Sequence, residues 1–289
     1  MQPTNLLLQQ ISNIARQAGD IIRSAHIPDA APHQEKDDSF SSDHNNILHQ
    51  KSGHANFVTY YDSKVQAFLI KALSEILPGA SFYGEEDGMD VFSAQYSSGY
   101  TFVIDPIDGT SNFMKSVFPY VTSIGLLCDG EPFIGVIYAP QSDQLFTAAK
   151  GCGAYENGIR IHSSGEPLSM SLVTMGTAPY NLPLSSEAFR LAAAYKPLCI
   201  DIRRSGSAAW DICMAASGRT GFYFEPEVQL YDYAAGACIA AEAGAVVTDL
   251  EGNPLPFRKG AVSIAVASEG VASSPYLPGD LLKMKLREQ

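Results

Sequence analysis

The chain has 289 residues, of which 46% are apolar and 17% are charged, and its formal net charge is −12 at pH 7. This composition provides ample material for a buried core, and the negative charge argues against nucleic acid or an anionic membrane surface as the main partner. A phosphorylated substrate is not excluded, because bound Mg²⁺ can invert the sign of a carboxylate-rich pocket.

The sequence contains no apolar run near the ~20 residues that a membrane helix needs. Its first 25 residues lack the basic start and apolar block of a signal peptide. The cysteines are dispersed and form no Cys-x-x-Cys pair, so we expect a cytoplasmic protein with reduced, buried cysteines. They are Cys128, Cys152, Cys199, Cys213 and Cys238.

At the start of the chain, apolar residues recur at intervals of three and four between Leu7 and Ile21, which predicts an amphipathic helix. From Pro28 to Ala55 the sequence is polar and contains several histidines. Their irregular spacing matches no zinc-ligand pattern, so the composition favours a long solvated loop over a metal site. These histidines are His33, His44, His49 and His54.

A second helix is predicted after Asn56–Asp62, with Ser63 and Gln66 as its capping box and an apolar stripe that ends near Ile76. A short strand, Ser81–Gly84, then leads into three consecutive carboxylates. These acids form either a solvated turn or, because they follow a strand, a further set of metal ligands.

The most informative segment begins with an apolar strand from Tyr100 to Ile104. This strand ends at Asp105, and Asp108 follows three residues later. The proline and the glycine next to them predict a tight turn, because proline fixes φ and glycine tolerates any φ. Two hard oxygen ligands for a divalent cation therefore lie within one short segment.

Directly after this turn, Thr110 and Ser111 are good helix-starting residues whose neighbouring amides can face an anion. The segment therefore also offers a backbone cradle for phosphate. An acidic turn that caps a helix would show the same pattern, and the segment alone leaves both interpretations open.

The rest of the N-terminal half is predicted to form a hairpin and two further strands, and the C-terminal half to alternate strands and helices. The predicted strands are Val121–Leu127, Phe133–Tyr138, Leu145–Ala148, Ala154–Ile161, Leu168–Met175, Leu198–Ile202, Gly221–Glu225, Ala245–Asp249 and Val262–Ala267. The predicted helices are Ser186–Tyr195, Ser207–Ser217, Asp232–Ala243 and Asp280–Leu286.

Two of these helix starts carry polar residues that bear on a possible site. Asp232 begins a helix of small residues, whose N-terminus can therefore approach another element closely; a simple N-cap is the alternative interpretation. Arg203–Ala209 opens the preceding helix in a similar way, and Glu225 lies between the two.

Four segments occur in one order and together resemble the inositol monophosphatase family, the lithium-sensitive, Mg²⁺-dependent phosphatases. They are Asn56–Asp62, Gly84–Glu86, Asp105–Asn112 and Asp232–Gly236. The resemblance covers nearly the whole chain, and the run Asp-Pro-Ile-Asp-Gly-Thr-Ser-Asn-Phe is highly specific. The chain also looks like bacterial members in Arg203–Ala209 and Gly151–Gly158.

The resemblance implies a layered α-β-α-β-α sandwich of mixed α+β and α/β character, usually assembled as a homodimer. It implies one unit over residues 1–289. An N-terminal α+β half (about residues 1–165) and a C-terminal α/β half (about residues 166–289) would pack around one active site.

By position, the resemblance also implies two to three bound Mg²⁺ ions. Glu85, Asp105 and the carbonyl of Ile107 would hold one, and Asp105, Asp108 and Asp232 a second. Glu85 would help with a third. The implied catalytic residues are Asp62, Glu85 and Thr110, where Asp62 and Thr110 orient or deprotonate the attacking water. The implied substrate contacts are Asp108, Gly109, Thr110, Glu225 and the Gly206–Ala208 backbone, which includes Ser207 and Ala208.

The expected reaction is hydrolysis of a small phosphomonoester, with inositol monophosphate as the leading substrate, by metal-activated water and without a covalent intermediate. The alternatives are 3′-phosphoadenosine 5′-phosphate, fructose 1,6-bisphosphate or histidinol phosphate as substrate, or a non-catalytic regulatory protein with the same fold. Departures from the family pattern concern substrate choice. Tyr231 stands where tryptophan is common, and Glu227 adds a second acid near Glu225.

The segment Pro28–Ala55 is longer than the corresponding family segment. We expect its distal part, Asp29–Asn46, to be dispensable for turnover, and Lys51–Asn56 to help order the site near Glu85.

Overall fold

The computed structural model describes residues 3–25, 48–50, 57–86 and 99–273. Within these residues, two large sheets form the body of the molecule. The first contains, in spatial order, β3 (Ser81–Gly84), β4 (Tyr100–Asp108), β5 (Val121–Cys128), β6 (Glu131–Ala139), β7 (Gln144–Ala149), β8 (Gly153–Glu156) and β9 (Ile159–Ile161). The second contains β11 (Asp201–Arg203), β10 (Leu172–Met175), β12 (Phe222–Val228), β14 (Val262–Ala267) and β13 (Val246–Thr248).

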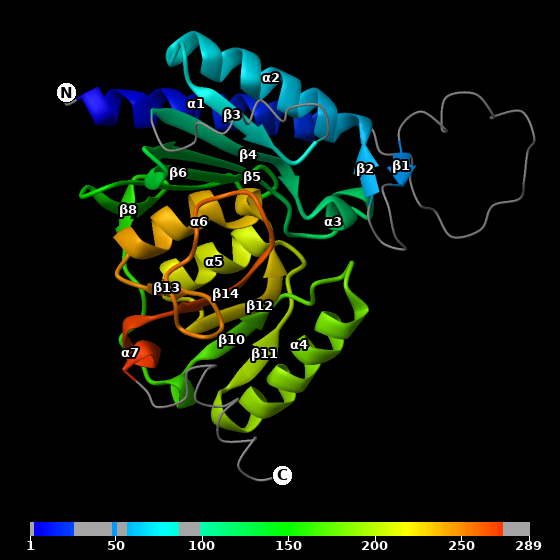
Figure 1. Ribbon diagram of the computed structural model, residues 1–289, viewed down its shortest axis with the longest axis vertical. Coiled ribbons are helices and arrows are strands. Elements are labelled where there is room, and N and C mark those ends of the chain that lie inside the picture. The colour runs from blue at the N-terminus through cyan, green and yellow to red at the C-terminus, as the bar shows by residue number, and fades with distance from the viewer. Residues whose placement is uncertain (1–2, 26–47, 51–56, 87–98, 274–289) are drawn as a thin grey trace, which may run out of the picture.

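Helices separate and cover the two sheets in the predicted α-β-α-β-α order (Figure 1). Two helices cover the outer face of the first sheet, two lie between the sheets, and one covers the second sheet. In that order they are α1 (Pro3–Arg23) and α2 (Tyr60–Ile76), α5 (Ala208–Ala216) and α6 (Leu230–Glu242), and α4 (Leu182–Tyr195).

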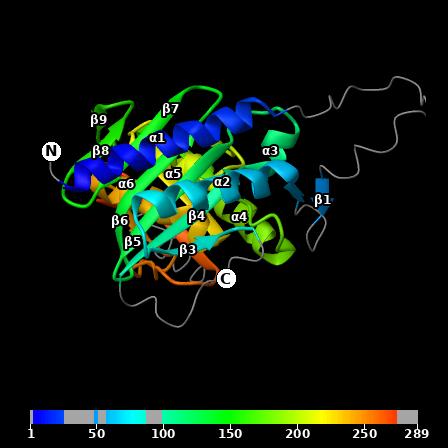
Figure 2. The ribbon, with the colours of Figure 1, turned by 90° about the horizontal axis from the view of Figure 1, so that it is seen from above.

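The outer pair, α1 and α2, lie side by side across the first sheet (Figure 2). The amphipathic pattern of α1 predicted this helix, and its apolar face is buried at Ile11, Ile14, Ala18 and Ile22. Burying such a stripe is the main source of helix stability in a folded protein.

Helix α2 begins three residues earlier than the sequence pattern predicted. Its N-cap is Thr59, whose hydroxyl accepts from the amide of Tyr61 (3.1 Å), while the amide of Thr59 donates to Asp62 (2.8 Å). The predicted capping box of Ser63 and Gln66 is therefore wrong. The observed helix start also matters for the candidate site, because it places Asp62 inside the first helical turn.

A short antiparallel pair, β1 (Leu48–Gln50) and β2 (Phe57–Thr59), precedes this helix. The predicted long loop therefore contains a strand at residues 48–50, which its polar composition did not reveal. The segments Asp29–Asn46 and Lys51–Asn56 lie outside the described residues, as does the predicted final helix Asp280–Leu286.

Small residues allow the central helices to pack closely on each other and on the first sheet. A Cβ built on Gly236 of α6 would lie 2.8 Å from Ile212 of α5, and one on Gly135 of β6 would lie 2.3 Å from the carbonyl oxygen of Ala235. The close packing predicted from the alanine-rich sequence of α6 is therefore observed.

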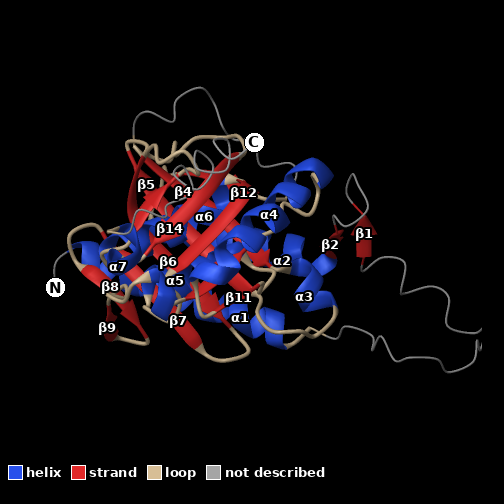
Figure 3. Cartoon of the chain, turned by 90° about the horizontal axis from the view of Figure 1, so that it is seen from below, coloured by secondary structure: helices blue, strands red, loops and turns tan. Residues whose placement is uncertain are grey.

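The second sheet packs against α4, which lies beside β12 (Figure 3). Tyr195 of α4 contacts the rings of Phe222 and Phe224 at centroid distances of 5.1 and 5.5 Å. The helix begins at Leu182 rather than Ser186, because Asn181 caps it and the following proline lies in its first turn, where proline is tolerated.

Two predicted strands near α4 are shorter than expected. Leu168–Met170 and Lys196–Leu198 form 3-10 turns, so β10 and β11 begin only after them. At the far end of the second sheet, α7 (Glu269–Ala272) follows β14.

Among the described residues, no helix is long and apolar enough to cross a membrane.

The prediction that all cysteines are buried is partly wrong. Cys213 and Cys238 are buried in the central helices, whereas Cys128, Cys152 and Cys199 are partly exposed. The exposed three lie at a strand end or in turns, where an apolar residue need not face the core.

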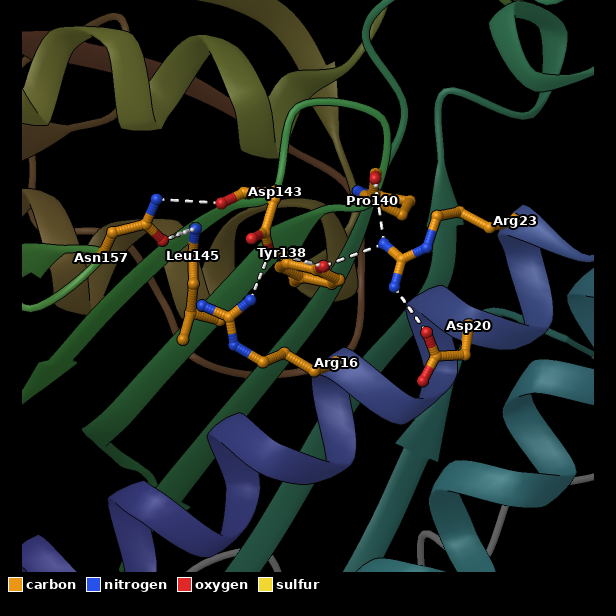
Figure 4. A network of polar contacts seen from close by, with 8 residues as sticks. All are labelled: Arg16, Asp20, Arg23, Tyr138, Pro140, Asp143, Leu145 and Asn157. Carbon is orange, nitrogen blue, oxygen red and sulfur yellow. Dashed lines mark hydrogen bonds and ion pairs between the residues drawn. The ribbon is translucent and has the colours of Figure 1, made fainter.

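A polar cluster fixes α1 to the β6–β7 hairpin (Figure 4). The hydroxyl of Tyr138 donates to Asp143 (2.8 Å) and accepts from Arg23 (2.9 Å), which also donates to the carbonyl of Pro140 (3.0 Å). Arg16 pairs with Asp143 and lies over the Tyr138 ring. We call Arg16, Arg23, Tyr138 and Asp143 the α1 clamp.

Candidate metal and phosphate site

Three carboxylates meet where the first sheet faces the central helices. Asp105 and Asp108 come from β4, and Asp232 comes from the first turn of α6. One oxygen atom of each lies within 4.8 Å of the other two. We call these three residues the acidic cluster.

An irregularity in β4 brings its two acids together. Asp105 pairs with Ser123 and Asp108 with Val121, so β4 uses one residue more than β5 over this step. In a regular strand, residues three apart point to opposite faces, and one extra residue restores them to the same face. The strand therefore continues through Asp108 with a bulge, whereas the sequence predicted that it ends at Asp105 and turns.

Asp105 is almost completely buried, with an exposed fraction of 2%. Its Oδ1 accepts from the amide of Ile107 (3.0 Å). Burial raises the pKa of Asp105 well above its usual value, and repulsion from Glu85, Asp108 and Asp232 raises it further. A bound cation would relieve both effects.

Asp108 connects the first sheet to α5. Its Oδ2 accepts from the hydroxyl of Ser207 and from the amide of Ala209, both at 2.7 Å. Burial raises the pKa of Asp108 to about 6, and these two hydrogen bonds oppose the rise. Ser207 also caps α5, because its oxygen accepts from the amide of Trp210 (3.3 Å).

Asp232 is the third residue of α6, where it completes a capping box with Gln229. Its Oδ2 accepts from the amide of Gln229 (2.6 Å). The interpretation of Asp232 as the N-cap is therefore wrong, since Gln229 occupies that position. Burial and repulsion from Asp108 raise the pKa of Asp232 well above its usual value.

Asp62 and Thr110 lie together beside this cluster. The Thr110 hydroxyl is 3.2 Å from Asp62 Oδ1 and 3.1 Å from the carbonyl of Ile107, and it can donate its single proton to either oxygen. Thr59 donates to the other oxygen of Asp62 through its amide (2.8 Å) and hydroxyl (2.5 Å). Burial raises the pKa of Asp62, and these hydrogen bonds oppose the rise.

The turn between Asp108 and α3 (Thr110–Met114) depends on glycine. Gly109 has φ of 93°, and a Cβ there would lie 3.0 Å from the carbonyl oxygen of Pro119. Asn112 then fixes the turn, because its side-chain amide donates to the carbonyls of Pro119 (2.6 Å) and Ser205 (2.9 Å).

A cavity of about 910 Å³ opens over the acidic cluster. Among the residues implied by the resemblance, all except Asp62 line it, and Asp62 lies behind Thr110. The lining members of that set are Glu85, Asp105, Ile107, Asp108, Gly109, Thr110, Gly206, Ser207, Ala208, Glu225 and Asp232.

Glu225 is held at one side of this cavity. It accepts from the hydroxyl of Tyr223 (2.7 Å) and from the amide of Ala178 (2.9 Å). A Cβ on Gly176 would lie 1.8 Å from its carboxylate, so this position requires glycine. Burial raises the pKa of Glu225, while these hydrogen bonds and the charge of Arg204 oppose the rise.

The sequence pattern did not identify several other lining residues. Tyr180, Arg204 and Asp211 also face the cavity. Asp211 accepts from the hydroxyl of Ser205 (2.8 Å), which places it behind the loop that holds Asp108. Arg204 lies within the segment Arg203–Ala209 and Asp211 just after it, a segment already assigned to a helix start, whereas no sequence signal marked Tyr180.

The donor chemistry of the acidic cluster fits Mg²⁺. The cluster offers only hard oxygen atoms, which Mg²⁺ prefers, and it comes from two separate elements. Like-charged carboxylates at this separation raise one another's pKa, and a divalent cation compensates their charge.

Comparison with known proteins supports the resemblance to the inositol monophosphatase family. A sequence profile described as "Inositol monophosphatase family" matches residues 5–277. The chain is 37% identical over 235 residues to the inositol-1-monophosphatase of Mycobacterium leprae, covering 78% of each chain. It is 33% identical over 226 residues to the Nus factor SuhB of Vibrio cholerae serotype O1, covering 78% of this chain and 80% of that one.

A solved structure shares the same fold. The inositol monophosphatase from Anabaena (Nostoc) sp. PCC 7120 matches with a TM-score of 0.76 and 27% identity, covering 98% of this chain and 96% of that one.

Proposed function

The chain belongs to the inositol monophosphatase family, and from that premise we propose that it hydrolyses inositol monophosphate or a similar polyol phosphate. Membership makes it a phosphoric monoester hydrolase. The observation that carries the more specific proposal is the placement of the Asp62–Thr110 pair beside three carboxylates that can hold cations.

The proposed metal ligands are the acidic cluster, Glu85 and the carbonyl of Ile107, which together would hold two to three Mg²⁺ ions. When bound, the ions neutralise the charge of the phosphate and lower the pKa of water beside them. Without such compensation, a phosphomonoester dianion and the acidic cluster would repel each other.

The chain's own residues then orient the water and the phosphate. The Thr110 hydroxyl would give its proton to the Asp62 carboxylate while the threonine oxygen takes a proton from the attacking water, so that Thr110 stays neutral and Asp62 holds the proton. Gly109 and Thr110 line the cavity, and their amides would donate to phosphate oxygens. No side-chain nucleophile is needed for this reaction.

The leaving alcohol is proposed to contact cavity residues that include Asp108. Asp108, itself a member of the acidic cluster, lines the cavity together with Ser207, Ala208 and Glu225. Carboxylates and backbone groups of this kind accept and donate hydrogen bonds to ring hydroxyls.

The test is release of phosphate from inositol monophosphate with and without Mg²⁺. Asp105→Asn should lower the rate by more than about 100-fold, because it removes a charge that would contact the ions, while its carbonyl can still accept from Ile107. Asp129→Asn is a matched control, since Asp129 is exposed and has φ of 51°, which asparagine tolerates.

The same assay ranks the alternative substrates 3′-phosphoadenosine 5′-phosphate, fructose 1,6-bisphosphate and histidinol phosphate. Full activity of Asp105→Asn at saturating Mg²⁺ would overturn the proposed metal site. Absence of phosphate release from every one of these substrates would overturn the proposed reaction.

A second candidate is a regulatory role, which the relative named Nus factor SuhB favours. The two roles separate in a strain that lacks the chain. Complementation by Asp105→Asn as well as by the wild type would support a role independent of hydrolysis, whereas complementation by the wild type alone would support the enzyme.

A further inference from the structure

One side of the cavity combines an aromatic ring with a carboxylate. Tyr180 precedes α4, and Glu227 lies near the end of β12; both line the cavity. Tyr180 lines the same cavity as the three residues of the acidic cluster. We call Tyr180 and Glu227 the distal wall.

The charge of Glu227 has no close cation among the described residues. Its one side-chain hydrogen bond there is accepted from the amide of Asn181 at 3.4 Å, a long and weak contact. Asn181 is also the N-cap of α4, where its side-chain oxygen accepts from the amide of Leu184. The Glu227 carboxylate therefore retains acceptor capacity toward the cavity.

Arg204 is the one cation that lines the cavity in the described part of the chain, and it does not offset Glu227. Its Nε donates to the hydroxyl of Thr177 (3.2 Å). Its positive charge opposes the rise that burial causes in the pKa of Glu225. Glu227 therefore adds a negative charge to this side of the cavity without a paired cation among the described residues.

We propose that the distal wall is a specificity-determining surface that ranks leaving alcohols by charge, favouring a protonated amine over a hydroxyl and a hydroxyl over a second anionic group. This inference rests on the proposed function, because it places the phosphate at the acidic cluster and the alcohol between the cluster and the distal wall.

Three physical effects act in the same direction. A carboxylate forms a charge-assisted hydrogen bond with an ammonium group, which is stronger than one with a neutral hydroxyl. The face of the Tyr180 ring attracts a cation. A carboxylate or second phosphate on the alcohol would be repelled by Glu227 in a site partly removed from water. Substrates with a second phosphate, including two of the alternatives above, are therefore disfavoured.

The test uses three substrates of nearly the same size, with glycerol 1-phosphate as the neutral reference. Serinol phosphate differs from it by an ammonium group in place of the C2 hydroxyl, and 3-phosphoglycerate differs from it by a carboxylate in place of the terminal CH2OH group. We expect kcat/KM to fall from serinol phosphate through glycerol 1-phosphate to 3-phosphoglycerate, by about tenfold between the first and the last, equivalent to ~1.4 kcal/mol. Glu227→Gln should reduce this ratio to within about threefold, mainly through KM.

A matched control separates a local effect from a change in net charge. Glu75 is exposed on α2, outside the cavity lining, so Glu75→Gln removes the same charge and should leave the ratio unchanged. Tyr180→Leu should lower the preference for the ammonium substrate, while Tyr180→Phe should keep it.

The outcomes distinguish this inference from the proposed function. If the wild type hydrolyses all three substrates with equal kcat/KM, or if Glu227→Gln preserves the full ratio, the distal wall does not select by charge, although the phosphatase stands. If the wild type hydrolyses none of them and no other phosphomonoester, the proposed function fails and this inference fails with it.

Discussion

The hydroxyl of Thr110 has one proton and two oxygen atoms within reach, which makes it a sensitive residue of the site. We expect Thr110→Ala to lower kcat by about 100-fold or more, the range typical of a lost proton-transfer group, with a smaller change in KM. Thr110→Ser keeps the hydroxyl and should retain most of the activity. Steady-state kinetics on the three proteins measure this split.

A different result would reassign the residue. If Thr110→Ala changes KM alone, Thr110 binds phosphate and does not act on the water.

Asp211 gives a second residue-scale prediction, which concerns pH. Burial raises its pKa well above the usual value, and repulsion from Glu225 and Asp108 adds to the rise. A carboxyl whose pKa is raised by folding stabilises the protein below its unfolded pKa, and this contribution is lost as the pH rises through the folded pKa. Asp211→Asn removes that titration, and its carbonyl can still accept from Ser205.

We therefore expect the advantage of Asp211→Asn in unfolding free energy to be larger at pH 8 than at pH 5. Each unit of pKa shift corresponds to about 1.4 kcal/mol. Urea unfolding of both proteins at the two pH values measures the difference, and parallel pH profiles would contradict it.

Residue spacing predicted which acids belong to the site better than it predicted how they are held. The three-residue interval between Asp105 and Asp108 made both acids candidate ligands, but their common direction depends on the bulge opposite β5. Asp108 is held by Ser207 and Ala209, which lie 99 and 101 residues later in the chain. No local pattern reveals contacts at such a separation.

At the scale of elements, the α1 clamp explains how the first helix is fixed. Tyr138→Phe removes a buried hydroxyl that donates to Asp143 and accepts from Arg23. We expect it to lower the unfolding free energy by about 1–2 kcal/mol, since both partners lose a hydrogen bond. Arg16→Ala breaks a pair whose members are 38% and 70% exposed and should cost less than about 1 kcal/mol.

Urea unfolding of the two variants compares these values directly. A larger loss for Arg16→Ala than for Tyr138→Phe would show that the surface ion pair, rather than the tyrosine hydroxyl, fixes the helix.

Helix existence was predicted more reliably than helix starts, and α2 shows why. Thr59 with Asp62 and Ser63 with Gln66 both have the spacing of a capping box, so the local sequence supports two starts. Burial selects the first, because Asp62 lies inside the protein and contacts Thr110, whereas Ser63 is exposed. Helix α6 likewise begins before its predicted start, because Gln229 is its N-cap and Asp232, its third residue, completes the capping box while it also joins the acidic cluster.

For the whole molecule, the candidate site lies between the two large sheets, and so metal binding should stabilise the entire fold. The residues of the acidic cluster, which are the proposed ligands, come from β4 and α6, and α5 holds Asp108 from the side of the second sheet. A cation that binds only the folded state adds about 2.7 kcal/mol at a concentration 100 times its Kd. We expect Mg²⁺ to raise the Tm of the wild type in one cooperative transition.

Asp105→Asn should be more stable than the wild type without metal and should gain less stability from Mg²⁺. Without metal at pH 8 it should melt above the wild type, because the raised pKa of Asp105 means that its charge destabilises the folded state at high pH. With Mg²⁺ its Tm should change little. Calorimetry with a chelator or with Mg²⁺ measures both effects, and an equal Mg²⁺ shift in the two proteins would place the ions elsewhere.

The position of Trp210 makes the protein its own optical probe. It is the only tryptophan in the sequence, and it is 8% exposed. Its ring forms T-shaped contacts with the rings of Phe118 and Phe146, at centroid distances of 4.7 and 6.0 Å. It follows Ala209, whose amide holds Asp108, and its own amide donates to Ser207. Emission excited at the indole therefore comes from a single fluorophore next to the site, and a titration with cation or phosphate can be followed without attaching a dye.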